Sequence, residues 1–84
     1  MNNPIEQHQQ LKKDHPESII LIRVGDFYET FFDDAEFIAS TGMTTLTIRE
    51  KKSEKPIPMT GFPFYNLLNV IDTLKDCEQS FYIT

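Results

Sequence analysis

The segment Gly25–Glu29, with the sequence GDFYE, places two aromatic rings beside two carboxylates, directly after an apolar run. A phenylalanine can enter the minor groove of DNA, wedge between stacked bases and kink the duplex. Side chains two residues apart on extended backbone point to the same side, so Phe27 could stack on a base while Glu29 reaches its edge. The structural alternative is that Phe27 and Tyr28 are core aromatics and Glu29 is an acid at a helix start. The residues alone leave both interpretations open.

The segment Arg49–Lys55, with the sequence REKKSEK, is a second candidate because it holds four of the eight basic residues. These four are Arg49, Lys51, Lys52 and Lys55. Basic side chains on a loop favour contacts to DNA phosphates, which position a protein without reading sequence. Glu50 and Glu54 dilute the positive charge, so a solvated hairpin turn is the alternative.

Motifs for catalysis are absent from the sequence. It contains neither a glycine-rich phosphate loop nor a GxSxG nucleophile elbow. The adjacent Asp33 and Asp34 are predicted to lie on a solvated acidic helix face. His8 and His15 have no cysteine or glutamate at zinc-ligand spacing, so we expect no metal and no cofactor. We therefore expect a protein that is not an enzyme.

Hydrophobic periodicity and turn residues predict three helices and four strands. The helices are expected at 4–15, 30–41 and 63–77. The strands are expected at 18–24, 44–50, 56–60 and 80–84. The run Ile19–Ile22 has no alternation and predicts a strand covered on both faces. Two prolines in 56–60 predict a strand that is short or at a sheet edge, and Gly25–Glu29 is expected to be a strand-to-helix loop.

These elements define an α/β or α+β fold, with a small mixed β-sheet flanked by about three helices in the order α-β-α-β-β-α-β. The strand, helix and strand over 18–50 predict a right-handed crossover. The last helix is predicted to present an apolar stripe of Phe64, Leu67, Leu68, Ile71 and Leu74. A length of 84 residues allows one domain, over 1–84.

Charge and composition limit the partners. Thirteen acids and eight bases give a net charge of −5, which argues against nonspecific binding to nucleic acid, because that affinity comes from Lys and Arg on phosphates. A local basic patch is compatible with this balance. No apolar run approaches the roughly 20 residues of a membrane span, and the N-terminus lacks a secretory pattern. With one cysteine, Cys77, and no internal disulfide, we expect a cytoplasmic location.

From Arg23 to Glu29 the sequence RVGDFYE resembles the mismatch-recognition domain that opens MutS-type DNA mismatch repair proteins. The resemblance continues through ETFFDDA at 29–35, LTIR at 46–49 and PIPMTGFP at 56–63, and it covers about residues 4–84. In that family the domain continues with further strands, so the resemblance implies a module that lacks them. The connector, lever, clamp and ATPase domains of the family have no counterpart in these 84 residues.

The resemblance also implies roles for individual residues. Phe27 would stack on a mispaired base from the minor groove, and Glu29 would hydrogen-bond the same base. Asp26 and Tyr28 complete the motif and would shape the loop. Arg49, Lys51, Lys52 and Lys55 become candidate phosphate contacts. The implied partner is double-stranded DNA with a mismatch or bulge, bound weakly by the isolated module because it has few phosphate contacts.

The alternative function belongs to another class. The chain would keep the scaffold as a non-catalytic interaction module and would not bind DNA alone. Its acidic surface and an open sheet edge would then contact a second copy of itself or another repair protein.

Overall fold

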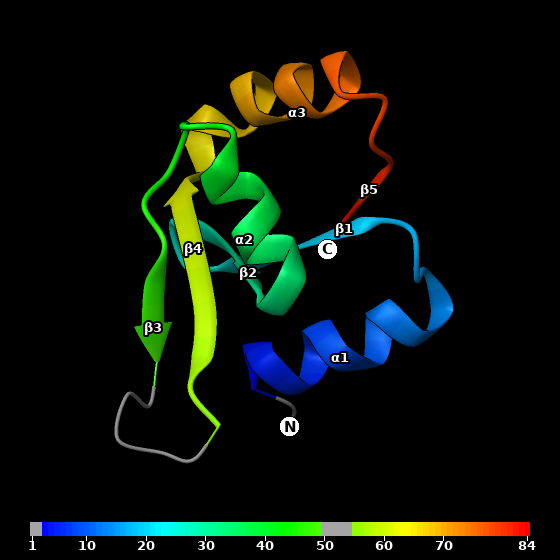
Figure 1. The fold of residues 1–84 in the computed structure, drawn as a ribbon, viewed down its shortest axis with the longest axis vertical. Coiled ribbons are helices and arrows are strands. Elements are labelled where there is room, and N and C mark those ends of the chain that lie inside the picture. The colour runs from blue at the N-terminus through cyan, green and yellow to red at the C-terminus, as the bar shows by residue number, and fades with distance from the viewer. Residues whose placement is uncertain (1–2, 50–54) are drawn as a thin grey trace.

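The computed structural model describes residues 3–49 and 55–84, which form a five-stranded sheet and three α-helices (Figure 1). The helices are α1 (Pro4–Asp14), α2 (Phe32–Ser40) and α3 (Leu67–Asp76), the last preceded by the short 3-10 helix η1 (Phe64–Asn66). The strands are β1 (Ile19–Val24), β2 (Phe27–Phe31), β3 (Thr47–Arg49), β4 (Ile57–Pro63) and β5 (Phe81–Ile83). They lie in the order β3-β4-β2-β1-β5, with β5 parallel to β1 and the other neighbours antiparallel.

The predicted fold class is confirmed, since a mixed sheet is flanked by three helices and the predicted elements follow one another in the predicted order. One strand was missed. Residues 27–31, expected as a loop and a helix start, form β2 between β1 and β4. The predicted crossover from 18–24 to 44–50 is also wrong, because β3 pairs with β4 at the edge of the sheet farthest from β5.

The prolines of β4 do not confine it to an edge, contrary to the prediction. β4 has seven residues and lies between β3 and β2. Pro58 stands just outside the β2–β4 ladder, and Pro63 is the last residue paired in it. Because proline removes only its own N–H donor, both positions leave the centre of this ladder intact.

The apolar stripe of the last helix differs from the predicted one. Val70 and Leu74 are buried, whereas Phe64 and Leu68 are exposed. Phe64 lies in η1, outside the helix, and within α3 the inward face follows Leu67, Val70 and Leu74, which directs Leu68 outward. Within residues 3–49 and 55–84, none of the helices has the length and apolar character needed to cross a membrane.

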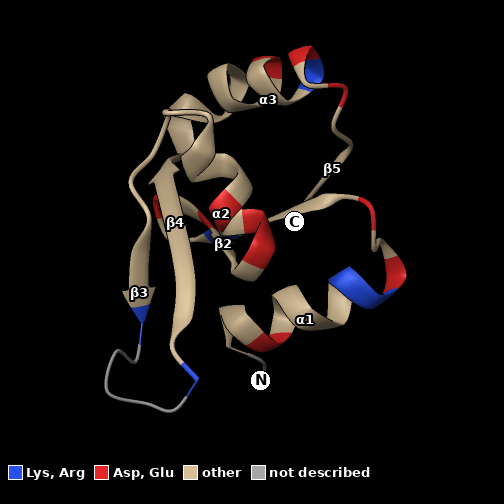
Figure 2. Ribbon diagram, in the orientation of Figure 1, with Lys and Arg blue, Asp and Glu red and all other residues tan. Residues whose placement is uncertain are grey.

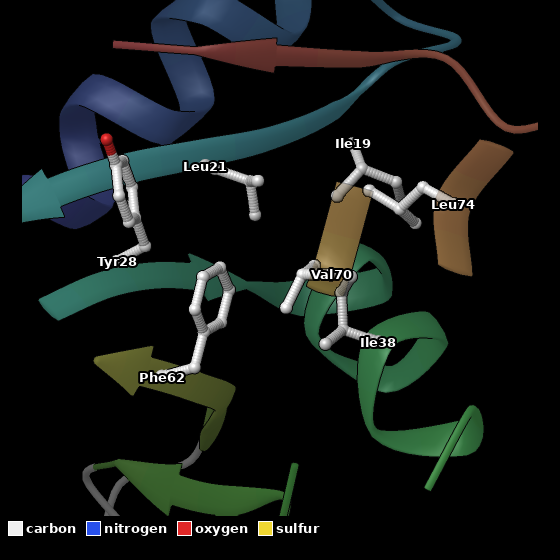
Figure 3. Packing of buried hydrophobic residues seen from close by; sticks show 7 residues of the cluster. All are labelled: Ile19, Leu21, Tyr28, Ile38, Phe62, Val70 and Leu74. Atoms are coloured by element: carbon white, nitrogen blue, oxygen red, sulfur yellow. The ribbon is translucent and has the colours of Figure 1, made fainter. Parts of the chain in front are cut away.

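The two faces of the sheet have separate partners. One face packs against α2 and α3 in the core cluster of Figure 3, which consists of Ile19, Leu21, Tyr28, Ile38, Phe62, Val70 and Leu74. The other face carries Ile20, Ile22 and Phe31, and α1 lies against it. All four residues of Ile19–Ile22 are at most 4% exposed, so β1 is covered on both faces as predicted.

Candidate nucleic-acid interface

The GDFYE motif lies on a hairpin whose turn is fixed by neighbouring residues. Gly25 has φ +59°, in the left-handed region that glycine adopts without strain, and the turn Gly25–Asp26 joins β1 to β2. The Phe64 N–H donates to the Asp26 carbonyl at 2.8 Å, and Arg23 Nε donates to the Gly25 carbonyl at 2.5 Å. The predicted strand-to-helix loop is therefore a hydrogen-bonded hairpin end.

Strand alternation separates the residues of the FYE triplet. Phe27 is 52% exposed, whereas Tyr28 is 7% exposed and stacks on Phe62 with the ring centroids 5.7 Å apart. Glu29 is half-buried and shares the face of Phe27 because it follows two residues later in β2. Of the two interpretations that the sequence left open, the core aromatic applies to one residue of the pair only. Tyr28 is a core aromatic, and Phe27 is not.

Phe27 stays exposed because α1 covers only the other end of β2. The ring of His8 on α1 lies 5.7 Å from the Phe31 ring and 5.9 Å from the Phe32 ring. Phe27 lies four residues before Phe31, about 13 Å away along an extended strand. The part of this face that carries Phe27 and Glu29 is therefore beyond the His8 contact.

Gly61 of β4 keeps the same face open beside Glu29, with which it pairs. A Cβ at position 61 would lie 2.9 Å from the Tyr28 carbonyl oxygen and 3.6 Å from Glu29 Cγ. The first distance is shorter than a real Cβ tolerates, so any other residue there would displace the strands. Glycine therefore allows β4 to approach β2 and leaves space for the carboxylate.

Of the predicted basic residues, Arg49 and Lys55 lie at the other end of the sheet from the turn. Arg49 ends β3 and Lys55 stands just before β4, both exposed, while Lys51 and Lys52 fall outside the described residues. Figure 2 shows the basic positions at these neighbouring ends of β3 and β4. Arg49 pairs with Ile57, whereas Phe27 pairs with Pro63 at the opposite end of β4, about 20 Å along the strand. The structure therefore does not bring Arg49 and Lys55 close to Phe27 and Glu29.

Asp34 is buried, at 3% exposed, and the prediction that it is solvated is wrong. Its Oδ2 accepts from His8 Nε2 at 2.8 Å and from the Ile20 N–H at 3.1 Å, and its Oδ1 accepts from Lys12 Nζ at 2.7 Å. The chain leaves the sheet at Phe32, whose φ is +58°, and this turn brings Asp34 to the Ile20 amide. The carboxylate therefore connects α1, β1 and α2.

Opposing effects act on the pKa of Asp34. Burial favours the neutral acid, but hydrogen bonds from His8, Lys12 and the Ile20 amide, together with the Lys12 charge, outweigh it and hold the pKa below its ordinary value of 3.8. A pocket of about 570 Å³ adjoins this carboxylate between α1 and the start of α2, and neither Phe27 nor Glu29 lines it. Over the described ranges, no three or more His, Cys, Asp and Glu side chains are arranged to hold a metal ion. The wedge candidates and the buried network are therefore separate parts of the molecule.

An exposed phenylalanine is one of the apolar side chains that minor-groove proteins insert between base steps. The family model of MutS domain I matches residues 3–79. The chain therefore belongs to the MutS domain I family.

Relatives with the name DNA mismatch repair protein MutS agree with this assignment. The protein of Lactococcus lactis subsp. lactis is 46% identical over 72 residues, which cover 86% of this chain and 9% of the relative. The protein of Streptococcus sanguinis is 44% identical over 70 residues, which cover 83% of this chain and 8% of the relative. The protein of Streptococcus mutans is 43% identical over 72 residues, which cover 86% of this chain and 8% of the relative. The chain thus spans less than a tenth of the length of these relatives.

Proposed function

We propose that this chain binds mispaired or bulged double-stranded DNA, with Phe27 as the minor-groove wedge and Glu29 as its hydrogen-bonding partner on the base. The observation that carries the proposal is the 52% exposure of Phe27 on the same strand face as Glu29, in a chain of the MutS domain I family. Asp26 supports the turn through its carbonyl, and Tyr28 fixes β2 to the core.

Selectivity would come from the energy needed to deform the duplex. Inserting a ring requires the bases at one step to unstack, at a cost of about a few kcal/mol for paired DNA. A mispaired or bulged base is already poorly stacked, so the same wedge enters at lower cost. The protein would then read deformability at the site of the defect and need not read a particular sequence.

Affinity of the chain alone is expected to be weak. The net charge is −5, and a protein gains affinity for DNA chiefly by placing Lys and Arg on phosphates. Arg49 and Lys55, about 20 Å from the wedge, are candidate phosphate contacts, and Lys51 and Lys52 remain candidates from the sequence alone. We infer a recognition role within mismatch repair, without catalysis by this chain.

Fluorescence anisotropy at low salt tests the proposal with three duplexes: matched, single-mismatch and one-base-bulge. The parent should prefer the defective duplexes, and Phe27→Ala should bind all three alike. Met43→Ala is the matched control, because Met43 is an exposed apolar residue outside the hairpin, between α2 and β3. Equal discrimination by the parent and Phe27→Ala would refute the wedge assignment.

A second candidate function is a protein-interaction or self-associating module, and one observation favours it. Tyr65 is 75% exposed and Leu68 is 74% exposed, on η1 and the first turn of α3, where they are three residues apart. Exposed apolar side chains that are neighbours on a helix are typical of contact surfaces. Size-exclusion chromatography with and without duplex DNA separates the two functions, because self-association would shift elution in the absence of DNA.

A further inference from the structure

The side chain of Arg23 makes its contacts around the hairpin. Arg23 pairs with Tyr28 across β1 and β2, and its guanidinium carbon lies 5.5 Å from the Tyr28 ring centroid and 4.8 Å from that of Phe64. Its Nε also donates to the Gly25 carbonyl. Among the residues that the structure describes, no carboxylate forms an ion pair with it. The side chain therefore joins the turn to two aromatic rings and neutralises no acid there.

Phe64 makes a second contact with the turn, through its backbone. The Phe64 N–H donates to the Asp26 carbonyl, so Phe64 holds one turn residue through its backbone and contacts Arg23 through its ring. Arg23 in turn holds the other turn residue, Gly25. Both central residues of the hairpin are thus fixed to η1, one directly and one through the guanidinium.

From this geometry we propose that Arg23, together with Phe64, is a positioning residue that fixes the orientation of the Phe27 wedge and so sets how strongly defective DNA is preferred over matched DNA. The inference rests on the proposed function. A wedge held in one orientation fits only a step that has opened to receive it, whereas a hairpin that samples several orientations adapts to any step. Loss of Arg23 should therefore reduce preference more than affinity.

The competing explanation is that Arg23 contacts a DNA phosphate directly, and substitution by lysine separates the two. Lysine keeps the charge for a phosphate but lacks the planar group that stacks on rings and the Nε–H that binds the turn. Under the positioning role, Arg23→Lys and Arg23→Met both lower the preference for the mismatch by about three- to five-fold, the effect of one hydrogen bond, because neither variant has the Nε–H that binds the Gly25 carbonyl. Under a phosphate role, Arg23→Lys is neutral and Arg23→Met weakens all duplexes equally, with a salt slope lower by about 0.9.

The experiment has two arms, both on the full chain. The first measures hydrogen exchange of the Phe64 amide in the free protein by NMR, where both Arg23 variants should exchange about three- to five-fold faster than the parent because both lack the Nε hydrogen bond to the turn. The second measures anisotropy with matched and mismatched duplexes over a salt series. Phe64→Leu should repeat the loss of preference. Lys75→Met, which removes a positive charge at the end of α3 away from η1, is the control for charge.

Unchanged exchange of the Phe64 amide in both Arg23 variants would overturn the inference, and so would a preference that Arg23→Lys preserves. If the parent itself prefers no duplex, the proposed function fails and the exchange arm alone decides whether Arg23 holds the turn. Faster exchange then supports the positioning role for the hairpin, and unchanged exchange refutes it.

Discussion

Replacing Asp34 by asparagine removes the charge of the buried carboxylate and leaves the size of the side chain almost unchanged. The carboxylate accepts three hydrogen bonds, at 2.7, 2.8 and 3.1 Å, from Lys12, His8 and the Ile20 amide. An asparagine oxygen can keep the partners of one carboxylate oxygen, but its NH₂ group would face the donors of the other. Lys12 is partly exposed, so water compensates part of its loss.

The expected cost of Asp34→Asn is about 2–3 kcal/mol in the free energy of unfolding, the upper part of the range for hydrogen bonds to charged groups. For a domain of this size that corresponds to a Tm lowered by roughly 10–20 °C. The matched control is Asp33→Asn, which removes the same charge from the neighbouring, exposed position and should cost less than about 1 kcal/mol. Thermal unfolding followed by circular dichroism at pH 7 measures both variants.

The stability difference between the parent and Asp34→Asn should also depend on pH. Because the pKa of Asp34 is lowered on folding, its charge contributes stability that is fully present above the unfolded-state pKa, near 3.8. That contribution is lost as the pH falls through the folded-state pKa, so the two melting curves should converge in acid. Equal Tm values for Asp34→Asn and Asp33→Asn at pH 7 would show that the buried network does not stabilise the fold.

Three further predictions concern the proposed interface. Gly61→Ala should cost about 1–3 kcal/mol in chemical denaturation, because its Cβ would lie 2.9 Å from the Tyr28 carbonyl; an unchanged midpoint would contradict this. Glu29→Gln should strengthen binding to matched DNA more than to mismatched DNA, because it removes a carboxylate that phosphates repel; competition binding would disprove this if both affinities fell alike. Arg49→Met should weaken all duplexes by the same factor and lower the salt slope by about 0.9, and a change confined to the mismatched duplex would argue against a phosphate contact.

Patterns carried by many residues were predictable from the sequence. The run Ile19–Ile22 predicted a strand buried on both faces, and α1 on one side and the core cluster on the other supply the cover. Phe81 and Ile83 also share a face against the core, as expected for the last strand. Such patterns are reliable because each buried residue adds hydrophobic free energy to the same arrangement.

Strand β2 was not predicted because its alternating pattern is short and overlaps the helical pattern of the next segment. Alternation within Phe27–Phe31 extends over five residues only, and Phe31 also fits the helical period of the residues that follow. The abrupt change from strand to helix at Phe32, with its φ of +58°, has no counterpart in propensity, because tertiary contacts such as the Asp34–Ile20 hydrogen bond are needed to hold it.

The helical spacing of Asp34 indicates a buried position, but its charge favoured the prediction that it is exposed to solvent. Asp34 lies three residues after Phe31 and four before Ile38, both buried, so helical spacing places it on the inward face. Its partners come from α1 and β1, which are far away in sequence, and no local pattern predicts them. The exposure of Phe27 depends in the same way on where α1 lies against β2, which only the folded structure shows.

Insertion of Phe27 between bases is most directly measured with 2-aminopurine placed next to a mispair, because this base fluoresces more strongly when it unstacks. Saturating parent protein should raise the fluorescence on the mismatched duplex and leave the matched duplex almost unchanged. Phe27→Ala, at a concentration that gives equal occupancy by anisotropy, should produce no rise. An equal rise with the parent and Phe27→Ala, or no rise with saturating parent, would contradict the assignment of Phe27 as the wedge.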